Sequence, residues 1–342
     1  MLVTGESLIV IDANGNGIYN EPGVDGMTWD GATFLFPLPA PAESFCTLNN
    51  VYTGLTFGPW GEQATVRSTP FTCAVPETRV ILQGVNTKRV NIGLTPRPED
   101  PALSADLQKH CQYMQANSTL RHDEDKNAPG FTAEGNKAGL RSILSQGTPP
   151  PDIAYNMVQT YLHRLDVLRP DTTAFGAGFA GGFGGIDGRT TLILKPPAAY
   201  WPVLCPAPEQ TGCGLNFQNE MPDPCPGDKS AGLPITVYFN TDKLDLKSWK
   251  LTAIGSADAA NARPTAPGTR QPAAAPETVP CYEHWPGHGP AADLTKFEKV
   301  VCLIPMDPLK PNTRYRVTMT VMVDTTPWER TWEFATGAGG GK

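Results

Sequence analysis

The apolar residues of this chain of 342 residues change their spacing twice, and this limits the folds that the chain can adopt. Up to about residue 77, and again after residue 200, they alternate or form short β-branched runs between turns, as strands do. From residue 78 to residue 200 they recur three and four residues apart, as on one face of a helix. We therefore predict a multi-domain protein with a β-rich module at 1–77, an α+β sandwich at 78–200, a β-sandwich at 201–336 and a flexible tail at 337–342.

Composition argues against two kinds of partner. The chain carries 27 Lys and Arg against 34 Asp and Glu, a net charge of -7, and has no basic cluster that would bind the phosphates of nucleic acid. Its longest apolar runs, such as Leu8–Ile11 and Val300–Ile304, are far shorter than a membrane span. We therefore expect no nucleic acid as a partner and no segment that crosses a membrane. The 34 Gly and 35 Pro predict a globular fold that is rich in turns.

Capping residues locate the helices of the middle segment. Asp100 stands where an N-cap side chain is needed, and Pro101 follows at the favoured first helical position. The apolar stripe of this helix is Leu103, Leu107, Cys111 and Met114. Further elements are expected as helices over 81–92, near 135–144 and after 151, and as a strand over 190–194. The segment should therefore place helices against a small sheet.

An early loop carries oxygen-bearing side chains at alternate positions, in the string VIDANGNGIYNEPGVDG. Calcium binds several oxygen ligands on a tight loop, and Gly17 permits the sharp turn that such a loop needs. The candidate ligands are Asp12, Asn14, Asn16, Ile18 through its carbonyl, and Glu21. The string resembles the calcium loops of B-type repeats in bacterial surface adhesins. It is no EF-hand, because Gly23 holds the twelfth position, and the alternative is an Asn-Gly turn that binds no metal.

The eight cysteines indicate disulfides, since none has the CxxC spacing of a zinc site. Two pairs flank strands within one module each, and we expect the bridges Cys46–Cys73 and Cys281–Cys302. Cys213–Cys225 is a further candidate, and the pairing of the other two stays open. Disulfides predict an extracellular, cell-surface or periplasmic location. The start MLVTGESLIV lacks the regions of a signal peptide, so we expect a mature or trimmed product, or a wrongly assigned gene start.

Five stretches of the middle segment carry a family resemblance. They are NTKRVNIGLTPRPEDPALSADLQKHCQYM, LRHDED, GFTAEGNKAG, YLHRLDVL and FGAGFAG. Together they resemble the bacterial form of the CAP superfamily, the cysteine-rich secretory and pathogenesis-related proteins. The last segment, through QTGCGLNFQNEMPDPCPG, GLPITVYF and LKPNTRYRVTM, is similar to the bacterial Ig-like domain that often follows such domains. The resemblance implies a CAP-like α+β domain followed by an Ig-like β-sandwich.

The CAP resemblance implies a cleft lined by two histidines and two acidic residues. Carried over by motif, its members are His122, Glu134 and His163, and the second acidic position falls on Thr160. Two imidazoles and one carboxylate can hold Zn²⁺ with an open position, or a water for general-base catalysis. They can also hydrogen-bond one another and fix helix ends. The missing acid argues against Zn²⁺ and catalysis and favours the structural role.

Two further groups of polar residues are expected to have structural roles. His110 lies on the inner side of its helix and is expected to be a satisfied core histidine, and the acidic run at 122–125 is expected to be a solvated loop. His284 and His288 are four residues apart, but the Pro and Gly around them forbid the helix that would bring them together on a metal.

Three functions are compatible with these features. The first is an extracytoplasmic binding or structural protein, a surface or assembly component with a degenerate CAP domain and other extracytoplasmic proteins as partners. The second is a CAP protein that binds a lipid or small apolar molecule, and the third is a metal-dependent hydrolase that uses the CAP cleft. We expect the first, and a binding or structural role rather than an enzyme. Calcium is the one cofactor that the residues suggest.

Overall fold

The computed structural model describes residues 2–339, with gaps at 4–5, 20, 22–23, 30–35, 39–44, 48–49, 59–62, 71–75, 193–200, 226, 228–229, 257–275, 291 and 293–298. Its internal contacts divide the chain into two compact units. Unit 1 is Met1–Val158 with His163–Tyr200, and unit 2 is Gln159–Leu162 with Trp201–Lys342. Unit 2 thus includes a short segment from the middle of the predicted α+β domain, which no sequence pattern predicted. No helix among the described residues is long and apolar enough to span a bilayer.

The first part of unit 1 forms two small antiparallel sheets. One is β1 (Leu2–Val3), β2 (Glu6–Ile11), β3 (Gly26–Trp29) and β4 (Phe36–Pro37), in that order, and the other is β5 (Phe45–Cys46), β6 (Asn50–Phe57) and β7 (Ala64–Pro70). Alternation along β2 buries Leu8 and leaves Ile9 exposed. The buried core residues are Leu8, Met27, Trp29, Phe36, Leu38, Tyr52 and Leu55. The candidate calcium loop joins β2 to β3, which pair from Leu8 opposite Trp29 to Ile11 opposite Gly26.

The helices of unit 1 are α1 (Pro76–Val90), α2 (Pro101–Asn117), α3 (Ala133–Gly139), α4 (Pro150–Val158) and α5 (Leu162–Val167). The predicted start of α2 is confirmed, because the Asp100 side chain accepts the N–H groups of Ala102 and Leu103. All members of its predicted stripe, Leu103, Leu107, Cys111 and Met114, are buried. Capping and helical spacing therefore located this helix correctly.

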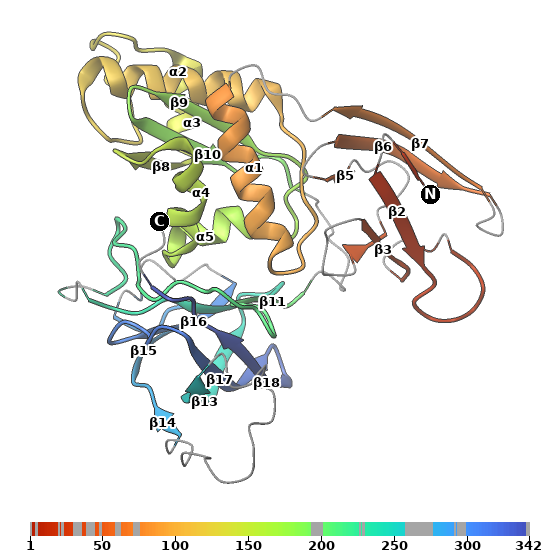
Figure 1. Ribbon diagram of the computed structural model, residues 1–342. Helices are drawn as coiled ribbons and strands as arrows, with labels where there is room; N and C mark the ends of the chain where they lie inside the picture. The colour runs from red at the N-terminus through yellow and green to blue at the C-terminus, as the bar shows by residue number, and fades with distance from the viewer. Residues whose placement is uncertain are drawn as a thin grey trace. The chain divides into compact units, whose positions relative to one another are not determined.

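The sheet of this region is β8 (Ile143–Gln146), β10 (Phe183–Asp187) and β9 (Gly176–Ala180), all antiparallel. Helix α2 packs directly on β9 (Figure 1). Glycine makes this close approach possible, since a Cβ at Gly178 would stand 2.8 Å from the backbone of Leu107 and Gln108. At Gly176 an added Cβ would stand 2.5 Å from the Leu103 side chain. The glycine-rich run is therefore the surface on which the helix rests.

The bounds of two predicted elements of this region differ from those in the structure. The helix expected near 135–144 ends at Gly139, and Ile143–Gln146 is strand β8. The strand expected over 190–194 is limited to one bridge, between Leu192 and Thr172, and residues 193–194 lie outside the described part of the chain. The inner strand is β10, although its glycines have low strand propensity. Short apolar runs fit helix and strand alike, and their packing decides between them.

Unit 2 contains two four-stranded antiparallel sheets. The first has the order β11 (Val203–Cys205), β12 (Ile235–Tyr238), β16 (Val300–Pro305) and β15 (Cys281–His284). The second has the order β14 (Glu277–Thr278), β13 (Leu244–Ser256), β17 (Thr313–Val323) and β18 (Thr326–Ala335). Alternate residues of both sheets share one buried core, in which Val237, Leu303 and Val317 are fully buried. Unit 2 therefore includes a β-sandwich.

The predicted Cys281–Cys302 disulfide does not fit the register of β15 and β16. Cys281 lies opposite Pro305 and Cys302 opposite His284, so the two cysteines are offset by three positions and point to opposite faces of the sheet. Neither this pair nor Cys213–Cys225 is joined in the structure. The Cys46 side chain and Cys73 lie outside the described residues. Cys111 is buried in α2, and burial raises the pKa of its thiol to about 12.

Candidate functional site

The loop between β2 and β3 brings the predicted calcium ligands together. Asp12 Oδ1 accepts N–H bonds from Gly15 at 2.7 Å and Asn16 at 3.2 Å, and Oδ2 accepts one from Gly17 at 2.6 Å. The Gly17 N–H bond contributes most to a lowered pKa of the Asp12 carboxyl. Asp12 is therefore ionised at neutral pH, with its charge directed at the turn.

The two asparagines complete the loop in the same way. Asn14 Oδ1 accepts the Asn16 N–H at 3.1 Å, and Asn16 Oδ1 accepts the Ile18 N–H at 2.8 Å. Their amide nitrogens donate to Glu21 Oε2, at 3.1 Å from Asn14 and 2.6 Å from Asn16. Residues 12, 14, 16 and 21 therefore share one small exposed site.

Asp25, which the sequence analysis did not single out, holds the two ends of this loop. Its Oδ1 accepts the Ala13 N–H at 3.2 Å, and its Oδ2 accepts the Glu21 N–H at 2.9 Å. The residue is 1% exposed. A buried carboxylate must be satisfied, and the backbone of the loop satisfies this one. The signal in the sequence was an acidic residue just before the apolar run of β3.

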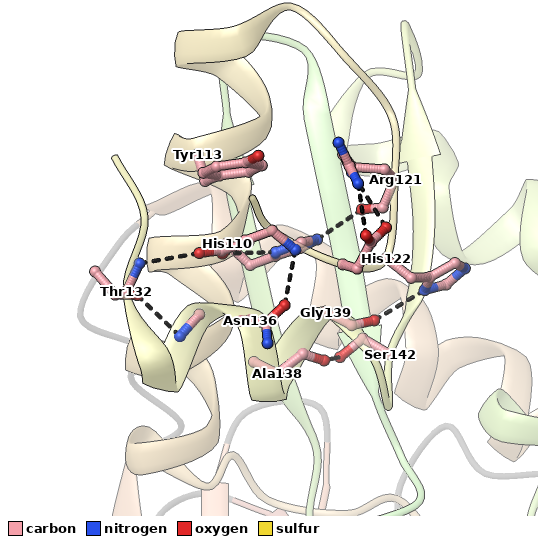
Figure 2. Close-up of polar contacts among 12 residues, drawn as sticks. His110, Tyr113, Arg121, His122, Thr132, Asn136, Ala138, Gly139 and Ser142 are labelled. Atoms are coloured by element: carbon pink, nitrogen blue, oxygen red, sulfur yellow. Dashed lines mark hydrogen bonds and ion pairs between the residues drawn. The ribbon is translucent and has the colours of Figure 1, made fainter. Parts of the chain in front are cut away.

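A second polar cluster ties helix α2 to the loop before α3 (Figure 2). His110 Nδ1 lies 2.8 Å from Glu124 Oε1, and His110 Nε2 lies 2.9 Å from the Arg121 carbonyl; the side chains of His110 and Glu124 are fully buried. The second Glu124 oxygen accepts the Thr132 N–H at 2.9 Å, and Asn136 Oδ1 accepts the Glu124 N–H at 2.7 Å. Each ring nitrogen therefore has an oxygen of the protein within hydrogen-bond distance.

The prediction of a core position for His110 is confirmed, and the prediction of a solvated loop is wrong for Glu124. His110 is a satisfied core histidine, as predicted, whereas Glu124 is 7% exposed and no part of a solvated loop. The available signal was the position of His110 on the buried face with Leu107 and Met114. A buried imidazole needs acceptors, and the acidic run after the helix supplies one.

The three residues carried over from the CAP motif lie on different elements. His122 is exposed, and its Nδ1 lies 2.8 Å from the Gly139 carbonyl (Figure 2). The Glu134 side chain is 57% exposed and faces Lys109 at 3.6 Å. His163 lies partly buried in α5. The described contacts of His122 and Glu134 are with other residues, and no group of three His, Cys, Asp or Glu among the described residues is arranged to hold a metal.

Comparisons with known proteins give a structural likeness that is limited to part of the chain. No protein-family model matches the chain, and no curated protein matches it. A crystal structure of an extracellular protein containing an SCP domain, from Bacillus anthracis str. Ames, matches 54% of this chain and 67% of its own, with 13% sequence identity and a TM-score of 0.27. The roles of individual residues therefore depend on the contacts described above.

Proposed function

We propose that this protein is an extracytoplasmic binding or structural protein, a component of a surface or an assembly, in which the loop after β2 binds calcium. The observation that carries the proposal is the gathering of Asp12, Asn14, Asn16 and Glu21 at one exposed turn. Under this proposal the modules bind partners through their surfaces, and calcium stiffens the β-rich module at 1–77.

The chemistry of the donor set fits calcium. Every group at the turn offers oxygen, the ligand that hard cations prefer, and none offers the sulfur or imidazole nitrogen that zinc favours. Asp12, Asn14, Asn16 and Glu21 would hold the ion through side chains and Ile18 through its carbonyl. Each side-chain oxygen that accepts one backbone N–H keeps a second lone pair for a cation.

Calcium would stabilise the loop by replacing hydrogen bonds with ion contacts at a turn that lies in water. The amides of Asn14 and Asn16 now occupy Glu21 Oε2. Loops of this kind in extracellular modules bind calcium at roughly 10⁻⁴ to 10⁻³ M, which matches the calcium level outside cells rather than inside.

The second polar cluster supports a structural role for the CAP-like region. His110 and Glu124 are buried and fully bonded to the protein itself, which leaves no open position for a substrate. His122 and Glu134 each bond to a different element. A hydrolase would need these groups to converge on one reacting atom.

The test is a calcium titration of the full chain, followed by thermal unfolding and by terbium luminescence. Millimolar calcium should raise the melting temperature by a few degrees, since an ion at about ten times its Kd adds roughly 1.4 kcal/mol. Asp12→Asn removes the charged ligand and should abolish the rise. Asp106→Asn, an acidic residue paired with Lys109 on α2, is the matched control and should respond as wild type does. A wild-type protein that calcium leaves unchanged would refute the site.

A further inference from the structure

His284 lies at the end of β15 in an unusual environment for a histidine. Its residue surface is 0% exposed, and it stands opposite Cys302 on β16. Neither ring nitrogen has a hydrogen-bond partner among the described residues. Gly289, at φ +104°, brings the following loop over the ring, where an added Cβ would stand 2.8 Å from His284 Nδ1. The imidazole is therefore enclosed and makes no hydrogen bond there.

The segment Gln159–Leu162 covers this ring. The ring of Tyr161 lies 5.2 Å from the His284 ring, tilted by 45°. Glu220 anchors the same segment, because its Oε1 accepts the N–H groups of Tyr161 at 2.7 Å and Leu162 at 2.9 Å. The Gln159 carbonyl accepts the Gln218 N–H at 3.0 Å. The segment is thus held by the Glu220 carboxylate and by packing on a neutral imidazole.

Protonation of His284 would disturb this arrangement. An imidazolium carries two N–H donors and a charge, and both need partners or water. Burial lowers the pKa of His284 to about 4, against the opposing pull of the Glu220 carboxylate. The other titratable groups nearby are the Cys302 thiol opposite, the Tyr161 phenol, His288 beyond the turn, and Glu283, which points to the other face of the sheet.

We propose that His284 is an acid-sensitive latch: the neutral ring holds Gln159–Leu162 in unit 2, and the protonated ring releases it. When the segment lifts, water reaches the imidazole and satisfies both nitrogens. The pKa of His284 is near the ordinary 6.5 in the open form and near 4 in the closed form. Between pH 6.5 and pH 4 the ring is therefore protonated in the open form and neutral in the closed form. Acidification from neutral pH to about pH 4 should favour opening on the order of a hundredfold.

Hydrogen exchange of the full chain tests this proposal, read at the amides of Tyr161 and Leu162 and corrected for the intrinsic pH dependence of exchange. Their protection should fall as the pH decreases from about 6.5 to about 4. His284→Phe keeps an apolar ring that cannot be protonated, and should lose most of this fall. His288→Phe, an exposed histidine stacked on Trp285 in the next turn, is the matched control and should behave as wild type does.

Two outcomes would overturn the latch. One is an acid response that persists in His284→Phe and disappears in Glu220→Gln, which would assign the titration to the carboxylate. The other comes from an NMR titration of the wild-type ring, which needs no variant that folds. A His284 pKa near 6.5 in the folded protein would show that the ring is not held neutral, and a value below about 5 supports the proposal.

Discussion

The role of a polar residue in this protein depends more on the residues that it contacts than on its amino-acid type. His122 and Glu134 match a motif, yet one bonds to a carbonyl and the other to a surface lysine. His110 and Glu124 match no catalytic pattern, yet they form a fully buried hydrogen-bonded pair. A motif specifies residue types at positions in sequence, whereas burial depends on which surfaces pack together. The ligands of the calcium loop were easier to predict, because they are local in sequence.

At this scale we predict that Glu124→Gln destabilises the protein by about 1–3 kcal/mol. Glu124 contacts His110 Nδ1 through one oxygen and accepts the Thr132 N–H with the other, and a neutral amide in its place loses the charge that strengthens both contacts. Urea unfolding measures the loss. Glu134→Gln is the matched control, since its exposed side chain should change the free energy of unfolding by less than about 0.5 kcal/mol. Equal effects of the two changes would contradict the structural role of the buried pair.

Among the elements, helix α2 and strand β9 show what sequence patterns can and cannot predict. The cap at Asp100 and the stripe from Leu103 to Met114 are encoded within one helix, and both predictions were correct. Strands β9 and β10 are rich in glycine and carry little strand propensity of their own. Their structure depends on the helix above them, which fits only where side chains are absent. The sequence shows the glycines but not the contact that requires them.

The contact predicts that Gly178→Ala costs about 1–3 kcal/mol of stability, because its methyl group would stand 2.8 Å from the α2 backbone. Chemical unfolding of the full chain measures the cost. Gly182→Ala is a useful comparison, since it meets open space but has a φ of +88° and reports backbone strain alone. A cost at Gly178 below the cost at Gly182 would mean that the helix can move away from the strand.

For the whole molecule, the sequence predicted the change from strands to helices and back, since each pattern extends over many residues. The strands of unit 2, such as β13 and β17, follow their β-branched alternation. The sequence patterns did not predict that Gln159–Leu162 belongs to unit 2. That assignment depends on contacts with Glu220 and His284, which lie far away in the sequence.

Acid should lower the stability of the whole protein through His284. Its pKa is about 4 when folded and 6.5 when unfolded, so the unfolded chain binds more protons between these values. The contribution of His284 to the free energy of unfolding is therefore fully present above about pH 6.5, and about 3 kcal/mol is lost as the pH approaches 4. Urea unfolding from about pH 7.5 to about pH 4.5 measures this slope, which should be shallower in His284→Phe. Identical slopes in both proteins would contradict a buried neutral imidazole.

The position of Gln159–Leu162 also sets an order for synthesis. The ribosome releases this segment well before it releases Glu220 and His284, which later hold it. Until then the residues that Tyr161 contacts in the folded protein have not been synthesised, although α4 and α5 on either side can already form. Unit 2 is therefore completed by residues made early and residues made late. A protein cut between residues 200 and 201 would deprive the second fragment of the piece that covers its histidine.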